Sequence, residues 1–187
     1  MKWLNKVEGL GKLLSSLKFS VDNRNISADQ GFAELKKLTI DVRENRKTIY
    51  VIGNGASASM ASHFAADLAK NGKLHTQVFS DLALITAISN DMGYKEVFAE
   101  PLRRRGNTGD MLVAISSSGR SDNILTAVVE AKRIGMKTVT ISAMDINNPL
   151  KAAGDLNLYL PAETYGDAES CHAAILHYWI DLVCQKS

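Results

Sequence analysis

The chain has 187 residues, of which 45% are hydrophobic and 22% charged, and its formal net charge is +2. These values are ordinary for a globular protein of this length, so we expect one domain over residues 1–187. The nearly balanced charge gives no electrostatic reason to expect a nucleic-acid partner. No run of about 18 apolar residues predicts a membrane span. Cys171 and Cys184 fall in one predicted helix, about 20 Å apart and too far to bridge, which favours a reduced, cytoplasmic protein.

The first 46 residues are predicted to form a pair of helices. Apolar residues at spacings of three and four from Trp3 to Val21 indicate one amphipathic helix, which ends at residues 22–25. Ser27 and Gln30 match a capping box that begins a second helix. Its buried face is predicted to carry Phe32, Leu35, Leu38 and Val42. The pair could cover the rest of the domain or associate with copies of itself, and the sequence leaves both possibilities open.

Residues 47–187 alternate between predicted strands and helices. The strands are expected at 49–52, 76–79, 111–115, 138–141 and 156–160. The helices are expected after the turn at 53–57 and at 82–90, 96–105, 122–134 and 167–185, with 90–94 as a loop. This alternation predicts an α/β fold with three layers, in which helices cover both faces of a doubly wound, five-stranded parallel sheet.

Residues 48–70 predict an anion-binding element. The apolar run at 49–52 is typical of a buried strand, and Gly53 to Ser57 turn the chain without bulky side chains. A helix follows, and Ser57 or Ser59 could cap it. A strand, a glycine turn and a helix start point free backbone N–H groups at an anion.

A run of serines at 116–121 follows the next strong strand and precedes another helix. Ligands of an open parallel sheet lie beyond the carboxyl ends of its strands, so we expect this run and the glycine turn to face one crevice. Their hydroxyl and N–H groups could bind a phosphate. The alternative is a flexible serine–glycine turn, but two such loops, each after a strong strand, favour phosphate.

Histidines and carboxylates fall in two of the predicted helices. His63 and Asp67 stand four residues apart and so share a helical face. Glu169 and His177 differ by only about 80° around the last helix, with His172 near the same face. These residue types are competent zinc ligands, although their spacing alone is weak support. The alternative for His63 and Asp67 is a pair of surface polar residues.

Five stretches of the chain resemble the sugar isomerase (SIS) family, and within it the phosphoheptose isomerases. These stretches are GNGASASMASHFAADL, SNDMGYKEVF, GDMLVAISSSGRSDNIL, AKRIGMKTVTIS and ESCHAAILH. The resemblance spans roughly residues 30–185. It implies a flavodoxin-like fold for residues 47–187, and an aldose–ketose isomerase that converts sedoheptulose 7-phosphate to D-glycero-D-manno-heptose 7-phosphate for surface polysaccharide such as lipopolysaccharide or capsule.

The resemblance also implies roles for particular residues. Those that would hold the phosphate are Ser57, Ser116, Ser117, Ser118 and Ser121. Asn54 and Asp91 would line the sugar site. The zinc ligands, one ion per subunit, would be His63, Asp67, Glu169 and His177. Asp67 and His177 would be the catalytic acid/base pair, and the family assembles as a homotetramer with its N-terminal helices, here residues 1–46, at the subunit interface.

The chain departs from the family pattern at Asp67, at Asn71 and over the stretch Gly166 to Ser170, where the family has aspartate or alanine followed by Arg-Ile-Gln-Glu. The family has glutamate where this chain has Asp67, glutamine at Glu169, aspartate or alanine at Gly166 and arginine at Asn71. These departures leave a second hypothesis open, a non-catalytic SIS protein that resembles the replication-initiator-associating homologues and binds a protein partner. The presence of both His63 and His177 favours the enzyme.

Overall fold

A single seven-stranded sheet forms the centre of the molecule in this computed structural model, which describes residues 2–22 and 24–185. The strand order is β2-β1-β7-β6-β5-β3-β4. The five strands from β7 to β4 are parallel, and they are the five that the sequence predicts. Their bounds are β3 (Thr48–Gly53), β4 (His75–Gln77), β5 (Met111–Ser116), β6 (Lys137–Ala143) and β7 (Leu156–Leu160). The predicted doubly wound, flavodoxin-like arrangement is confirmed.

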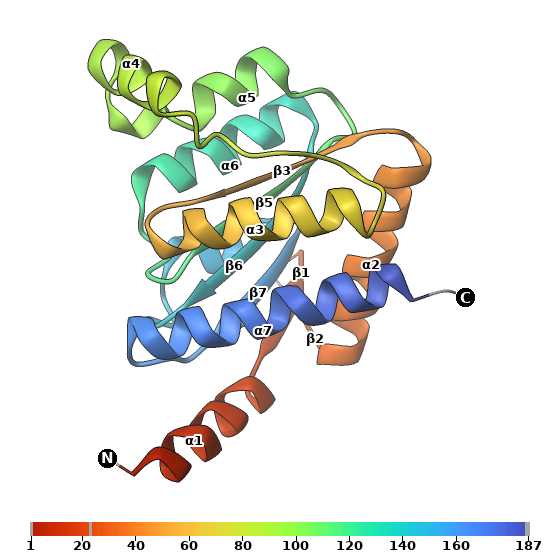
Figure 1. Cartoon of the computed structure of the whole chain (residues 1–187), viewed down its shortest axis with the longest axis vertical. Coiled ribbons are helices and arrows are strands. Elements are labelled where there is room, and N and C mark those ends of the chain that lie inside the picture. The colour runs from red at the N-terminus through yellow and green to blue at the C-terminus, as the bar shows by residue number, and fades with distance from the viewer. Residues whose placement is uncertain (1, 23, 186–187) are drawn as a thin grey trace.

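Helices cover both faces of the sheet (Figure 1). One face packs against α2 (Ala28–Glu44), α3 (Ala56–Lys70) and α7 (Tyr165–Cys184), around a core that includes Phe64 and Trp179. The other face packs against α4 (Leu82–Met92), α5 (Ala99–Arg105) and α6 (Asp122–Ile134). β5 is buried along its whole length because both faces are covered, which explains its continuous apolar sequence.

The N-terminal segment differs from the predicted pair of helices. The first helix, α1, ends at Ser15, and a hairpin of β1 (Lys18–Val21) and β2 (Arg24–Ile26) follows it. β1 pairs antiparallel with β7, so that the buried Phe19 lies opposite Leu158. The prediction of a helix to Val21 is therefore wrong. Without β1, the edge of β7 would present unpaired backbone N–H and C=O groups. The hydrogen bonds that β1 forms with β7 outweigh the local preference for a helix that the spacing of apolar residues indicates.

Helix α1 (Trp3–Ser15) projects from the rest of the molecule (Figure 1). None of its residues is buried, and Trp3 is 78% exposed. Leu4 and Val7 are exposed beside it. By contrast, α2 has the predicted capping box of Ser27 and Gln30, and it buries an apolar face against the sheet.

Smaller differences concern the segment before β5. The predicted loop at 90–94 begins as the last turn of α4, which continues to Met92. The predicted helix at 96–105 is divided into a 3-10 turn, η1 (Tyr94–Glu96), and α5. A second 3-10 turn, η2 (Pro149–Ala152), precedes β7. Among residues 2–22 and 24–185, none of the helices has the length and apolar character needed to cross a membrane.

Candidate active site

The glycine turn after β3 and the serine run after β5 line one cavity, as the sequence predicts. The cavity has a volume of about 280 Å³ and lies at the carboxyl ends of these two neighbouring strands. Its lining residues are Asn54, Gly55, Ala56, Ser57, Ile115, Ser116, Ser117, Ser118, Ser121, Tyr165 and Glu169. All five serines expected to hold a phosphate are therefore at the same cavity.

The glycine turn has a conformation that only small residues allow. A Cβ at Gly53 would lie 2.6 Å from atoms of Ser57, so the start of α3 packs directly on the end of β3. Gly55 has a positive φ of 54° and is the N-cap of α3. Neither Ser57 nor Ser59 caps the helix, because Ser57 already lies in its first turn, and this prediction is wrong.

Two of the three helices that begin at the cavity, α3 and α6, lack side-chain caps. In the described chain, α2, α4 and α7 each begin with a side chain that accepts a hydrogen bond from a backbone N–H. The N-caps of α3 and α6, Gly55 and Ser121, provide no such bond. The first N–H groups of a helix need an acceptor, and the positive end of the helix dipole favours an anion. Two uncapped helix starts and five serine hydroxyls thus make this cavity suited to a phosphate.

Hydrogen bonds fix the serine run, which argues against a flexible turn. The Oγ of Ser116 accepts a hydrogen bond of 3.2 Å from the Gly119 N–H and lies 3.4 Å from the Oγ of Ser121. The Arg120 N–H donates to the Oγ of Ser118 over 3.3 Å. Gly119 has a φ of 62°, and a Cβ there would overlap the side chain of Asn148.

The two residues expected at the sugar site lie in different places. Asn54 lines the cavity, but its side-chain amide exchanges two 2.9 Å hydrogen bonds with that of Asn123. The Tyr94 hydroxyl donates a further bond of 3.1 Å to Asn54. Asp91 is exposed near the end of α4 and borders a separate hollow with residues of α5. A single chain therefore does not bring Asp91 to the cavity.

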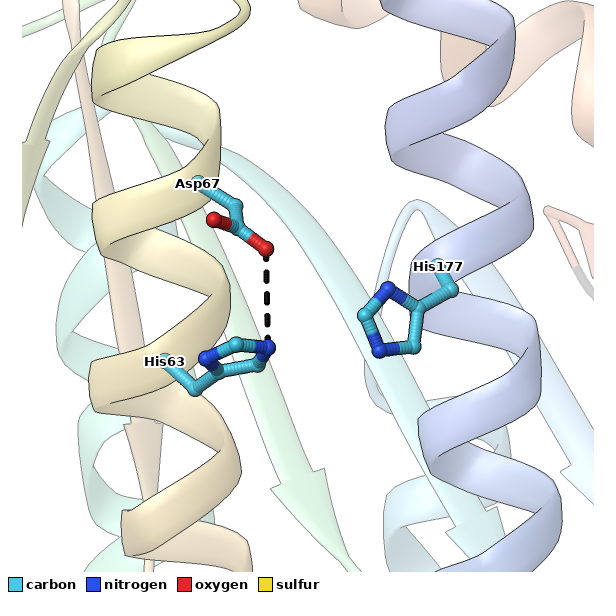
Figure 2. A group of neighbouring side chains, drawn as sticks. All are labelled: His63, Asp67 and His177. Carbon is cyan, nitrogen blue, oxygen red and sulfur yellow. Dashed lines mark ion pairs between the residues drawn. The ribbon is translucent and has the colours of Figure 1, made fainter.

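His63, Asp67 and His177 form a cluster on α3 and α7 (Figure 2). One potential ligand atom from each lies within 4.8 Å of the others. The Nε2 of His63 is 3.5 Å from the Oδ2 of Asp67, and the two histidine rings are 5.6 Å apart between centroids. The side chains of His63 and Asp67 are 56% and 23% exposed. The cluster is thus open to solvent in a single chain, and it contains three of the four predicted zinc ligands.

Glu169, the fourth predicted ligand, does not join the cluster. It lies eight residues before His177 on α7, which separates the two by about 12 Å along the helix axis. Instead it lines the cavity of the serine run. Their similar azimuth on the helix suggested a common site, but azimuth alone ignores the rise along the axis.

His172 is also separate from the cluster. Its side chain is fully buried, and within the described residues neither ring nitrogen has a hydrogen-bond partner. Burial lowers the pKa of His172 to about 4, and the backbone of Ser142 opposes this shift. The ring is therefore neutral at pH 7.

Tyr165 is a cavity residue that the sequence reasoning missed. It is the first residue of α7 and lines the cavity together with Glu169. The available signal was its position four residues before Glu169, which places both side chains on one helical face.

Comparison with known proteins identifies the family. The SIS domain matches residues 22–143. The phosphoheptose isomerase of Helicobacter pylori strain P12 is 38% identical over 152 residues, which cover 78% of this chain and 79% of that protein. The chain belongs to the phosphoheptose isomerases of the SIS-domain family. A phosphoheptose isomerase of Coxiella burnetii strain Dugway 5J108-111 is 36% identical over 150 residues, covering 76% of this chain and 75% of that protein.

Solved structures agree with this assignment. A phosphoheptose isomerase from Francisella tularensis superposes with a TM-score of 0.81 at 26% identity, over 100% of both chains. The phosphoheptose isomerase of Neisseria gonorrhoeae gives a TM-score of 0.77 at 27% identity, covering 96% of this chain and 91% of that one. The chain is therefore an aldose–ketose isomerase by family, and the predicted enzyme class is confirmed. The non-catalytic alternative is not favoured.

Proposed function

We propose that the protein interconverts sedoheptulose 7-phosphate and D-glycero-D-manno-heptose 7-phosphate. The observation that carries this proposal is the placement of two sites on the same two helices. α3 and α7 border the phosphate cavity at their N-terminal ends and carry the His63, Asp67 and His177 cluster further along. His63 lies about 9 Å along α3 from Ser57. A seven-carbon ketose phosphate likewise has its phosphate and its carbonyl at opposite ends.

The phosphate end of the substrate is assigned to Ser57, the run Ser116 to Ser118, and Ser121. Their hydroxyl groups, together with the uncapped starts of α3 and α6, can donate several hydrogen bonds to phosphate oxygens without a lysine. Asn54 borders the same cavity and orients the adjoining loop through its pairing with Asn123. These residues bind and orient the substrate but do not react.

The proton transfers are assigned to Asp67 and His177. Interconversion of a ketose and an aldose moves a proton between C1 and C2 through an enediol, so it needs a base and an acid on the reacting carbons and oxygens. The two side chains face each other from α3 and α7 (Figure 2). A histidine side chain can accept a proton in one direction of a reversible reaction and donate it in the other.

The cluster also suits a zinc ion. Catalytic zinc sites use three protein ligands drawn from histidine and carboxylate and leave one position open, which matches the donor set of His63, Asp67 and His177. A zinc ion bound there would stabilise negative charge on the substrate oxygens. This chain's own residues would then fix the geometry, with Asp67 next to His63 and His177 opposite them.

The proposal includes self-association into a homotetramer in the cytoplasm. In a single chain, the apolar surface of α1 and the side chains of His63 and His177 are exposed to solvent. Contacts with neighbouring subunits would bury them. In such an assembly the N-terminal segment, residues 1–46, lies at the interface, and a neighbouring subunit brings Asp91 to the sugar. Cys171 and Cys184 are free thiols, as expected in a reducing compartment.

The direct test is a panel of ketose phosphates of five, six and seven carbons, incubated with protein that has been refilled with zinc or treated with a chelator. We expect conversion of the seven-carbon substrate, faster with zinc. If no ketose phosphate is converted under either condition, the enzyme proposal fails and a non-catalytic binding protein takes its place.

A further inference from the structure

The segment that follows β6, residues 144–150, packs against the serine run. β5 and β6 are parallel neighbours in the sheet, so the segments after them begin side by side. The N–H of Ala143, at the end of β6, donates a hydrogen bond of 3.0 Å to the Ser117 carbonyl. The Leu150 N–H donates another, of 3.2 Å, to the Gly119 carbonyl. The position of the serine run therefore depends on the conformation of residues 144–150.

Asn148 fixes this conformation from inside the segment. It is only 3% exposed. Its Nδ2 donates hydrogen bonds to the carbonyl groups of Ala143, over 3.2 Å, and of Asp145, over 2.7 Å. Its Oδ1 accepts a bond of 2.9 Å from the Lys151 N–H and so caps the start of η2. Both polar atoms of the side-chain amide are thus bound to the backbone of the segment and its neighbours.

The same amide packs against Gly119 in the serine run. A Cβ added at Gly119 would lie 2.0 Å from Oδ1 and 2.4 Å from Cγ of Asn148, so the glycine backbone is in direct contact with the amide. The Gly119 N–H in turn donates to the Ser116 carbonyl over 3.1 Å and to the Ser116 Oγ over 3.2 Å. Asn148 is not one of the described residues that line the cavity. It therefore acts on a bound phosphate through the serine run.

Prior ordering of the serine run strengthens the binding of a phosphate. Ordering a loop or its side chains when a ligand binds subtracts from the affinity, and a loop that is already fixed avoids this loss. Residues that touch a ligand are held in the productive geometry by the packing and hydrogen bonds of residues behind them. We propose that Asn148 is a positioning residue, which orders the phosphate-binding serines through Gly119 and the segment after β6. The inference rests on the proposed function for the identity of the sugar phosphate, but inorganic phosphate suffices for its first test.

Calorimetric binding of inorganic phosphate to the full chain provides this test. Asn148→Ala should weaken phosphate binding by roughly tenfold, because the serine hydroxyls must then be ordered when the ligand binds. The KM for sedoheptulose 7-phosphate should rise by a similar factor. The kcat should stay within about twofold of the parent, because the proposed proton-transfer residues lie on other elements, α3 and α7.

Asn147→Ala is the matched control. It removes the same kind of side chain from the neighbouring residue, which is exposed, and it should bind phosphate as the parent does. Parental phosphate affinity in Asn148→Ala, or a loss of equal size in Asn147→Ala, would overturn the inference.

Asn148→Ser separates positioning from the capping of η2. Serine can still accept the Lys151 N–H, because it is a good N-cap residue, but it lacks the amide that packs against Gly119. We expect the midpoint of thermal unfolding to stay near that of the parent while phosphate binding remains severalfold weaker. Parental affinity in Asn148→Ser would show that only the cap matters and would overturn the inference.

A double-mutant cycle with Gly119→Ala tests the contact itself. The φ of 62° strains an alanine at this position in either background, but Asn148→Ala removes the two atoms that would lie closest to the added Cβ. Gly119→Ala should therefore weaken phosphate binding more in the parent than in Asn148→Ala. Equal losses in the two backgrounds would overturn the inference. A parent protein that binds phosphate with the predicted pattern of variants but converts no ketose phosphate would instead overturn the proposed function alone.

Discussion

The side chain of Asp67 is one C–C bond shorter than the glutamate that the resemblance implies at this position. Its carboxylate reaches His63 at 3.5 Å across one helical turn. Asp67→Glu should retain or raise kcat/KM on sedoheptulose 7-phosphate, because it restores the longer side chain. Asp67→Asn removes the proton acceptor and should lower kcat by roughly 10²–10⁴-fold. An Asp67→Asn variant that turns over at the parental rate would show that this carboxylate transfers no proton.

His172 should make the stability of the fold depend on pH. Burial lowers its pKa to about 4 in the folded protein, against about 6.5 in an unfolded chain. Between these values the unfolded chain binds a proton that the folded chain does not, so the free energy of unfolding falls as the pH is lowered. Between pH 7.5 and pH 5 we expect the loss from this residue to be about 2 kcal/mol.

Urea unfolding at both pH values, at one protein concentration and with a chelator present, measures this loss. His172→Leu should show a smaller drop between pH 7.5 and pH 5 than the parent does. His75→Gln, at an exposed histidine of β4, is the control and should keep the parental drop. Equal drops in the parent and in His172→Leu would contradict the assignment.

The sequence predicted correctly that the loops after β3 and β5 line one cavity. The serines and the glycine turn reach the cavity because the carboxyl ends of parallel strands meet at one edge. Glu169 lines the cavity in the single chain and does not lie beside His63, Asp67 and His177, because its helical azimuth resembles that of His177 while its height along α7 differs. Tyr165 was missed because an aromatic residue at a helix start has no distinctive signature until the cavity is visible.

At the scale of the elements, the contact between α2 and β1 depends on one glycine. A Cβ at Gly31 would overlap the ring of Phe19, which is buried in the core. Gly31→Ala should therefore destabilise the protein by about 1–3 kcal/mol, although alanine is the better helix former. Gly9→Ala is the matched control, because a Cβ there meets nothing within 4 Å, and it should stabilise by up to about 1 kcal/mol. Chemical unfolding of the two variants should show opposite signs, and equal effects would contradict the packing described.

The same region shows why one element could not be read from the sequence. Leu17 and Val21 continue the helical spacing of α1, so local pattern alone favours a longer helix. The hairpin forms because β7, far along the chain, offers an edge to which β1 can pair. The pairing of β1 with β7 joins residues that are far apart in the sequence. Hydrophobic periodicity reflects only residues that are close in the sequence, so it cannot predict this pairing. The capping box of α2 is a local signal, and it was predicted correctly.

For the whole molecule, we expect an assembly of four chains. The exposed Trp3, Leu4 and Val7 form an apolar surface on a helix that buries no residue in the single chain. Covering such a surface is favourable by roughly 25 cal/mol per Å². Light scattering at micromolar concentration should give the mass of a tetramer, and a Trp3→Glu/Val7→Glu variant should give a smaller species. A parent protein of monomer mass would contradict the tetramer. The cluster of His63, Asp67 and His177 would then remain exposed to solvent.

The proposed isomerisation of a heptose phosphate moves a proton between C1 and C2 through an enediol. NMR of sedoheptulose 7-phosphate incubated with the zinc-refilled protein in D₂O tests it most directly. We expect that aldose appears and that deuterium enters at C1 or C2, because Asp67 and His177 can exchange their acidic protons with solvent each time that substrate or product leaves the site. His177→Ala should lose both signals by at least ~100-fold. Aldose that forms without deuterium, or no aldose at all, would contradict the claim.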